Sequence, residues 1–285
     1  MSEPNMSEQN AEEWDVARAL AEAGKHLDRV EARILLRYAT GMTAAEVATY
    51  QERRLTPVGR ANFRALVARR EGGEPIAYLV GMREFYGRSF IVSPDVLIPR
   101  PETELLVDIG LARMASILAP RILDLGCGSG CVAVSLSLER PGANVTAVDR
   151  SAAALAVARR NAATLGATLR CVESDWFAAL AGTRYHLIVA NPPYIPVGDP
   201  HLLQGDLRFE PASALVGGSD GLADIRIIIA EAPAYLLPGG GLLLEHGYDQ
   251  AQAVHDLLSS AGFVDIGQHR DLAGIIRVSG GRLAA

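Results

Sequence analysis

The sequence predicts an α/β protein in which a doubly wound, largely parallel sheet follows a small all-helical region. Beyond Pro101, short apolar runs alternate with helical patterns, and such alternation requires right-handed crossovers between parallel strands. Before Gly72, apolar residues recur at helical spacing instead, as Val30, Ile34 and Tyr38 do. A length of 285 residues allows one large domain or two unequal ones.

Composition and charge narrow the class of protein. Hydrophobic residues make up 49% of the chain and charged residues 21%, which is typical of a globular protein. No apolar run approaches the roughly 18 residues of a membrane span, and the acidic opening is unlike a signal peptide. We therefore expect a cytoplasmic protein with a flexible tail at 1–11. The net charge of −6 disfavours stable nucleic-acid binding through phosphate neutralisation.

The residues that commonly bind metals are not grouped. Cys127, Cys131 and Cys171 show no C-x-x-C spacing, and the six histidines form no spaced set. We expect thiols and structural histidines, with no metal site and no disulfide.

The first domain is predicted at 12–73 and consists of short helices. Thr43 and Glu46 have the spacing of a capping box, Thr56-Pro57 begins a further helix, and Gly72 follows its end. No cluster suits chemistry, so we interpret this domain as one for substrate recognition or packing. Six arginines and one acid between Gln51 and Arg70 form either a solvated helix face or a contact surface for a partner.

A linker with a β-hairpin centred on Gly87 is predicted at 74–99, before the α/β domain at 100–285. That domain opens with a helix near 101–118, and further helices begin at Ser129 and Ser151. The last two strands lack room for a helix between them, so we expect them to pair antiparallel at an edge. The predicted strands are 121–125, 144–149, 168–172, 185–190, 241–245, 263–269 and 275–279.

The first strand of the α/β domain runs into a glycine-rich loop, Gly126-Cys127-Gly128-Ser129-Gly130. Alternate glycines let the backbone turn sharply and approach a ligand closely, at the sheet edge where α/β proteins bind ligands. The spacing is not G-x-G-x-x-G, and the Lys of a phosphate-binding loop is absent, so the loop is not shaped for a pyrophosphate.

The next strand ends at Asp149, whose carboxylate can accept both hydroxyls of a ribose. A ribose site without phosphate machinery suits S-adenosylmethionine, and Asp124 could orient its ammonium group. After the third strand, Asp175 could bond an exocyclic amine and Trp176 could wall an adenine, although Trp176 alone suits a core position equally well.

The fourth strand ends at Asn191-Pro192-Pro193-Tyr194. The two prolines stiffen the backbone and hold Asn191 out of any helix. The Asn191 side-chain oxygen and the Pro192 carbonyl are then acceptors for an incoming NH2 group, and Tyr194 offers a flat face for a planar amide or base. This pattern predicts methyl transfer to a planar nitrogen, catalysed by positioning and without a general base.

The motifs together resemble the protein-(glutamine-N5) methyltransferases that modify class 1 peptide chain release factors. The resemblance runs from about Asp28 to Arg282 and rests on EPIAYLVGMREFYG, VLIPRPETE, DLGCGSG, AVDRS, SDWF, NPPYI, QGDLRFEPASALVGGSDGL and LLLEHG. It implies a five-helix domain, a hairpin and a Rossmann-like, seven-stranded class I methyltransferase domain. It also implies cofactor contacts from Gly126 to Gly130 and at Asp149, Trp176 and Asn191, and a clamp on the substrate glutamine from Asn191 to Tyr194. Cys127 stands where this family commonly has Thr.

Two other functions remain open on the residues alone. N-P-P-Y does not distinguish a glutamine amide from the amino group of adenine in DNA or RNA, or from an amide of a ribosomal protein. A cofactor-binding adaptor without catalysis is the second alternative. The 16 arginines and 22 acids of residues 73–285 give that part a net negative charge, which disfavours a nucleic-acid substrate.

Overall fold

The computed structural model describes residues 14–284, so the tail predicted at 1–11 lies outside the described residues. The chain forms two compact units, with the boundary between Val80 and Gly81. None of the helices between 14 and 284 is long and apolar enough to cross a lipid bilayer.

The first unit is a small helical bundle. Thr43 and Glu46 form the predicted capping box, and the Thr56 hydroxyl accepts from the Gly59 backbone N–H at 3.0 Å. Phe63 packs at the centre of an apolar cluster in which it is fully buried, so this unit has a core of its own. Its helices are α1 (Val16–Ala23), α2 (Arg29–Thr40), α3 (Ala44–Thr49), α4 (Pro57–Glu71) and α5 (Ile76–Val80).

The arginines of the first unit do not form one uniform basic face. Three of the six between 51 and 70 pair with glutamates: Arg53 with Glu46 at 2.8 Å, Arg70 with Glu31 at 2.7 Å, and Arg69 with Glu74 at 2.5 Å. Arg60 and Arg64 lie over the Trp14 ring, 4.6 and 5.7 Å from its centre. Each of these five arginines therefore has a partner within the first unit.

The second unit begins with the hairpin of β1 (Met82–Phe85) and β2 (Arg88–Ile91). Its turn consists of Tyr86 and Gly87, both with positive φ, as a two-residue hairpin turn requires. Asn161 in α8 (Ala152–Leu165) accepts from the Ile91 N–H at 2.7 Å and donates to the Ile91 carbonyl at 2.9 Å. The hairpin is thus attached to the α/β unit, whereas residues 76–80 of the expected linker form a helix of the first unit.

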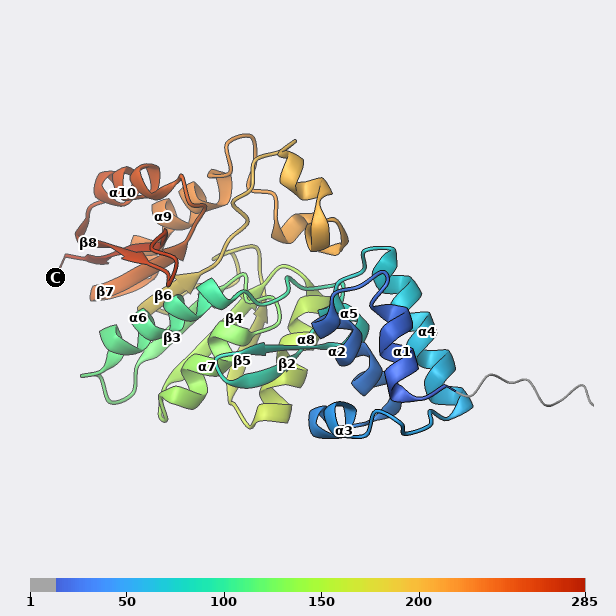
Figure 1. Cartoon of the computed structure of the whole chain (residues 1–285). Coiled ribbons are helices and arrows are strands. Elements are labelled where there is room, and N and C mark those ends of the chain that lie inside the picture. Colours follow the sequence, from blue (N-terminus) through green and yellow to red (C-terminus); the bar gives the residue numbers. More distant parts are fainter. Residues whose placement is uncertain (1–13, 285) are drawn as a thin grey trace, which may run out of the picture. The chain divides into compact units, whose positions relative to one another are not determined.

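The main sheet has the strand order β5-β4-β3-β6-β7-β9-β8. Helices α6, α7 and α8 cover one face, and α9 and α10 cover the other (Figure 1). The strands are β3 (Arg121–Leu125), β4 (Asn144–Asp149), β5 (Leu169–Glu173), β6 (Tyr185–Ala190), β7 (Leu236–Glu245), β8 (Phe263–Arg270) and β9 (Ile276–Leu283). The helices are η1 (Pro101–Thr103), α6 (Glu104–Met114), α7 (Cys131–Glu139), α8 (Ala152–Leu165), α9 (Ala223–Tyr235) and α10 (Ala251–Ser260), with short turns η2 (Pro200–Leu203), η3 (Gly205–Phe209) and η4 (Ala212–Ala214).

This arrangement confirms the predicted fold class, a mostly parallel sheet of seven strands within residues 81–284. The antiparallel pairing of the last two strands at an edge of the sheet is confirmed. Within this pair, β9 contacts β7 and β8 is the outermost strand. The first helix of the unit is shorter than 101–118, because α6 ends at Met114.

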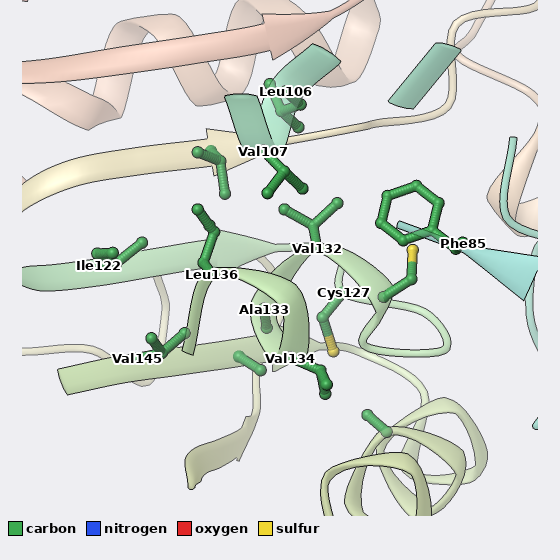
Figure 2. Packing of buried hydrophobic residues seen from close by; sticks show 14 of the residues in the cluster. Phe85, Leu106, Val107, Ile122, Cys127, Val132, Ala133, Val134, Leu136 and Val145 are labelled. Carbon is green, nitrogen blue, oxygen red and sulfur yellow. The ribbon is translucent and has the colours of Figure 1, made fainter. Parts of the chain in front are cut away.

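Apolar clusters on both faces of the sheet fix the ends of its strands. Figure 2 shows Val132 and Leu136 of α7 facing Val107 of α6, with Ile122 and Val145 of the sheet alongside. Burial of each such side chain contributes about 1.5 to 3 kcal/mol. The strand ends that carry the glycine loop and N-P-P-Y are consequently rigid starting points for both segments.

We expect Gly130→Ala to lower the free energy of unfolding more than Gly166→Ala does. Both glycines have a φ of +77°, which costs a residue with a Cβ about 1 to 2 kcal/mol. A Cβ at Gly166 has open space, whereas one at Gly130 would lie 3.0 Å from the Cβ of Ala158. Urea unfolding of the two variants measures the difference, and equal losses would contradict the close packing of the loop against α8.

Candidate active site

A pocket opens at the carboxyl ends of β3, β4, β5 and β6, where the strand order reverses between β3 and β6. Ligands of open α/β sheets bind at this position. Predicted site residues that line it are Asp124, Gly126, Cys127, Gly128, Ser129, Asp149, Asp175, Trp176, Asn191 and Pro193. Gly130, Pro192 and Tyr194 lie next to these residues in the chain but outside the pocket lining.

The glycine loop needs its alternate glycines for backbone conformation. Gly126, Gly128 and Gly130 all have positive φ, which only glycine adopts without strain. The Trp176 ring lies against the loop, since a Cβ on Gly126 would be 3.4 Å from its Cζ3. Gly130 directly precedes α7, so the loop passes straight into the first turn of that helix.

Asp149 is held in one orientation by backbone donors on both sides. Its Oδ2 accepts from the Gly128 N–H at 2.9 Å, and its Oδ1 accepts from the Ser151 N–H at 2.9 Å. Each carboxylate oxygen has further acceptor capacity, so the side chain can receive two hydroxyls without moving. This geometry is what recognition of a ribose requires.

Asp124 is a buried acid, only 2% exposed, at the base of the pocket. Its pKa is raised to about 8, mainly by burial and to a smaller extent by Asp149, while the hydrogen bond from the Ala133 N–H at 3.1 Å opposes the rise. A carboxyl in this environment favours a cationic neighbour, which would replace the lost hydration. The site is therefore suited to an ammonium group.

Trp176 serves the pocket and the core together. Its backbone φ is +44°, it lines the pocket, and its ring packs against the apolar cluster under α9 and α10. Burial raises the pKa of Asp224 in α9, and the neighbouring Trp176 side chain opposes that rise. Both interpretations drawn from the sequence, pocket wall and core residue, hold for this one side chain.

The N-P-P-Y corner is locked by tight backbone packing. A Cβ on Gly217 would be 2.4 Å from the Pro193 carbonyl oxygen, and one on Gly221 would be 2.2 Å from the Tyr194 carbonyl oxygen. Gln250 donates to the Tyr194 carbonyl at 3.0 Å. The corner therefore presents its groups from a fixed backbone, as the prolines alone suggest.

The Asn191 side chain donates from Nδ2 to the Thr103 hydroxyl oxygen at 3.3 Å. No other hydrogen bond of this side chain forms within residues 14–284, so its Oδ1 is available as an acceptor at the pocket.

The Tyr194 side chain is not part of the pocket lining. Its half-buried ring packs with the apolar cluster under α9 and α10, and its hydroxyl donates to Glu245 Oε1 at 3.4 Å. Burial raises the pKa of Tyr194, so the hydroxyl stays protonated.

A wall of the pocket consists of residues that sequence reasoning did not assign. The fully buried Glu210 carboxylate accepts from the Ile98 N–H at 3.0 Å and pairs with Arg100. Arg150 donates to the Ser213 carbonyl at 3.2 Å on the other side. Residues 210–214 are thus held in place at the pocket. Their sequence, EPASA, is part of a motif shared with the family, but it gives no local signal of a position at the pocket.

The thiols and histidines of the second unit have structural surroundings. Burial raises the pKa of Cys127 well above its ordinary value and that of Cys131 to about 12, so neither is a thiolate at neutral pH. His246 is buried, with Nε2 2.8 Å from the Ser279 hydroxyl and Nδ1 2.9 Å from the Gly247 carbonyl. Among residues 14–284, no group of three or more potential ligands could hold a metal ion.

Comparisons with known proteins identify both units. The family model of the PrmC N-terminal domain matches residues 15–81, and the family model of the methyltransferase small domain matches residues 103–201. A release factor glutamine methyltransferase of Burkholderia pseudomallei is 56% identical over 264 residues, covering 90% of this chain and 93% of the relative. The chain belongs to the release factor glutamine methyltransferase family. A relative of that name from Escherichia coli is 46% identical over 89% of this chain and 92% of its own.

Solved structures show the fold independently. A methyltransferase from Pyrococcus furiosus matches with a TM-score of 0.52 at 16% identity, covering 79% of this chain and all of that one. A 16S rRNA methyltransferase from Thermus thermophilus matches with the same TM-score at 20% identity, covering 71% of this chain and 49% of its own. The protein is an S-adenosylmethionine-dependent methyltransferase with a class I methyltransferase domain.

We expect the stability of this protein to fall with rising pH through Asp124. Its folded pKa of about 8 exceeds the ordinary 3.8, so the folded state binds more protons between these values than the unfolded state does. The free energy of unfolding then decreases over that window, by at most about 1.4 kcal/mol per pH unit. Asp124→Asn should flatten the slope in urea unfolding series.

Asp256→Asn, at a side chain that is 65% exposed, is the matched control and should keep the slope of the unmodified protein. A slope that Asp124→Asn leaves unchanged would show that Asp124 is ionised in the folded state.

Proposed function

We propose that this enzyme transfers a methyl group from S-adenosylmethionine to the side-chain amide nitrogen of the glutamine in the Gly-Gly-Gln motif of class 1 release factors, in the cytoplasm. The observation that carries the proposal is the position of Asn191. It stands on a locked corner at the edge of the ligand pocket, with an available acceptor oxygen. The names of the relatives support the same substrate.

The pocket residues fit the cofactor. Asp149 would hold the ribose hydroxyls, Asp124 the ammonium group, and the loop from Gly126 to Gly130 the methionine portion. Asp175 and Trp176 would bound the adenine. When bound, S-adenosylmethionine would supply the methyl group of its sulfonium. The demethylated cofactor then leaves as S-adenosylhomocysteine. Within the part of the chain from 14 to 284, no cationic side chain pairs with the buried Asp124, which favours a positively charged ligand here.

The corner would act on the substrate by position and charge. Asn191 Oδ1 and the Pro192 carbonyl accept the two hydrogens of the glutamine amide, which fixes the direction of its nitrogen. Alignment of reacting atoms can contribute about 7 to 11 kcal/mol through effective molarity. Both acceptors also stabilise the positive charge that grows on nitrogen in the transition state. The methylated nitrogen is acidic and loses its proton to water, so no base is required.

Recognition of the release factor is assigned to two regions. A Gly-Gly-Gln turn can bring its glutamine close to Asn191, because its glycines carry no side chains. The helical first unit would contact the factor elsewhere. The arginines from Arg53 to Arg70 are the candidates for this contact.

Methyl-labelled cofactor tests the substrate directly. We expect mass spectrometry of a class 1 release factor to find label on one residue, the glutamine of Gly-Gly-Gln, and none when that glutamine is replaced by alanine. Label on adenine in DNA or RNA, or on a ribosomal protein, would favour the first alternative. A stable complex with release factor but no transfer would favour an adaptor.

The roles of Asn191 and Asp149 separate in binding and turnover. We expect Asn191→Ala to keep most of the cofactor affinity and lower kcat by at least about 100-fold, because a transition-state acceptor is lost. Asp149→Ala should weaken cofactor binding by about 10- to 100-fold, the usual worth of hydrogen bonds to a charged group. Calorimetry and single-turnover rates measure both.

Glu173→Ala, an exposed acid at the end of β5 beside Asp149, is the control and should change neither quantity. Normal turnover in Asn191→Ala would refute the clamp.

A further inference from the structure

A network of polar side chains connects the two ends of the N-P-P-Y corner, and Thr103 and Asn191 within it line the pocket. Asn191 Nδ2 donates to the Thr103 hydroxyl oxygen at 3.3 Å, and the Tyr194 hydroxyl donates to Glu245 Oε1 at 3.4 Å. The Thr103 hydroxyl also lies beside the Glu245 carboxyl and opposes the rise of its pKa, as a hydroxyl hydrogen directed at the carboxyl does. Three separate segments contribute: Thr103 ends η1, Glu245 ends β7, and the corner follows β6.

Glu245 lies in an unfavourable position for a carboxyl group. It is 2% exposed, and its Oε2 has no hydrogen-bond partner among the described residues. Burial raises its pKa to about 7, opposed by Thr103, Arg277 and Tyr194 and reinforced by Glu102. A buried polar atom without a partner costs about 1 to 3 kcal/mol, so an apolar side chain would stabilise the fold better here. A role at the neighbouring site accounts for a carboxyl at this place.

The direction of the hydrogen bonds in this network matters for the clamp. The Thr103 hydroxyl has one hydrogen to donate, and while that hydrogen points to Glu245, its oxygen can only accept from Asn191. Asn191 must then offer its NH2 group to Thr103 and its carbonyl oxygen to the pocket. Were the hydroxyl to donate to Asn191 instead, the amide would turn over and present NH2 to a substrate NH2.

We propose that Glu245, acting through Thr103, is a positioning residue that fixes the Asn191 amide with its carbonyl oxygen toward the substrate amide. This inference rests on the clamp assigned to Asn191 under the proposed function. It holds in both protonation states of Glu245, since a carboxylate and a carboxylic acid each keep an acceptor oxygen for Thr103. Through the bond from Tyr194, the same carboxyl also fixes the far end of the corner.

Isosteric variants that remove one hydroxyl or the carboxyl test the network of bonds. We expect Thr103→Val and Glu245→Leu each to lower kcat by about 10- to 100-fold, as small misplacements of a reacting group do. The double variant should be no worse than the more damaging single one, because both changes break the same network. Thr103→Ser keeps the hydroxyl and should keep kcat. Cofactor affinity, measured by calorimetry, should stay unchanged throughout.

Thr146→Val is the matched control, since it removes a buried threonine hydroxyl in the middle of β4, away from the polar side chains of Asn191, Thr103, Glu245 and Tyr194. It should leave kcat unchanged. Thermal unfolding identifies any variant that loses its fold. If Glu245→Leu does not fold, the effect of Thr103→Val on kcat tests the proposed positioning of Asn191.

A second measurement does not depend on turnover. In protein with 15N-labelled asparagine, the Asn191 side-chain NH2 signals are assigned by their loss in Asn191→Ala. We expect Thr103→Val and Glu245→Leu to shift these signals and speed their exchange with water, and Thr103→Ser and Thr146→Val to leave them in place.

The outcomes distinguish this inference from the proposed function. Absence of methyl transfer by the unmodified enzyme would overturn the proposed function, and this inference with it. Transfer that depends on Asn191 but is indifferent to Thr103→Val and Glu245→Leu would overturn this inference alone. Additive losses in the double variant would likewise show that the two residues act separately.

Discussion

The pairing of β3 with β6 is the constraint on which the site depends. In this parallel register Leu125 lies opposite Ala190, so the next residues of the two strands, Gly126 and Asn191, leave the sheet side by side. The glycine loop and the N-P-P-Y corner thereby share one pocket, although more than sixty positions of sequence separate them. A shift of one residue would displace one strand end by about 3.3 Å, enough to move a hydrogen-bonding group out of reach. The apolar clusters on both faces of the sheet oppose such a shift.

Three acids around this pocket differ because their surroundings differ. Asp149 is held by two backbone N–H groups, which direct both oxygens. Asp124 is buried, which raises its pKa to about 8. Glu245 is buried behind the corner and meets hydroxyl groups rather than solvent. Under the proposed function, all three acids bind or position other groups, and none acts as a base for the amide nitrogen.

The sequence predicts what short-range patterns encode. The strands from β3 to β6, the capping box, the hairpin turn and the glycine loop all follow from local periodicity and backbone preference, and the structure contains them. Asn191 and Asp149 could be singled out because they end strands of a predicted parallel sheet. The place of β9 between β7 and β8 could not, because no local signal sets the order of distant strands.

The residues that support the site could not be found this way either. Thr103 is 88 positions from Asn191, and Ile98 is 112 from Glu210, so only the folded chain brings these partners together. Similarly, the run of arginines predicts a basic face, but α2 and α3 supply Glu31 and Glu46, which neutralise part of it. Trp176 shows that one residue can satisfy two interpretations that seem exclusive on the sequence.

The central claim is that a fixed corner grips a glutamine amide by both of its hydrogens. A crystal structure of the enzyme with S-adenosylhomocysteine and a Gly-Gly-Gln segment of release factor measures this most directly. The account predicts that the glutamine nitrogen lies within about 3.2 Å of both Asn191 Oδ1 and the Pro192 carbonyl oxygen, on the pocket side of the corner. A glutamine amide bound by other residues, with Asn191 pointing away from it, would contradict the account.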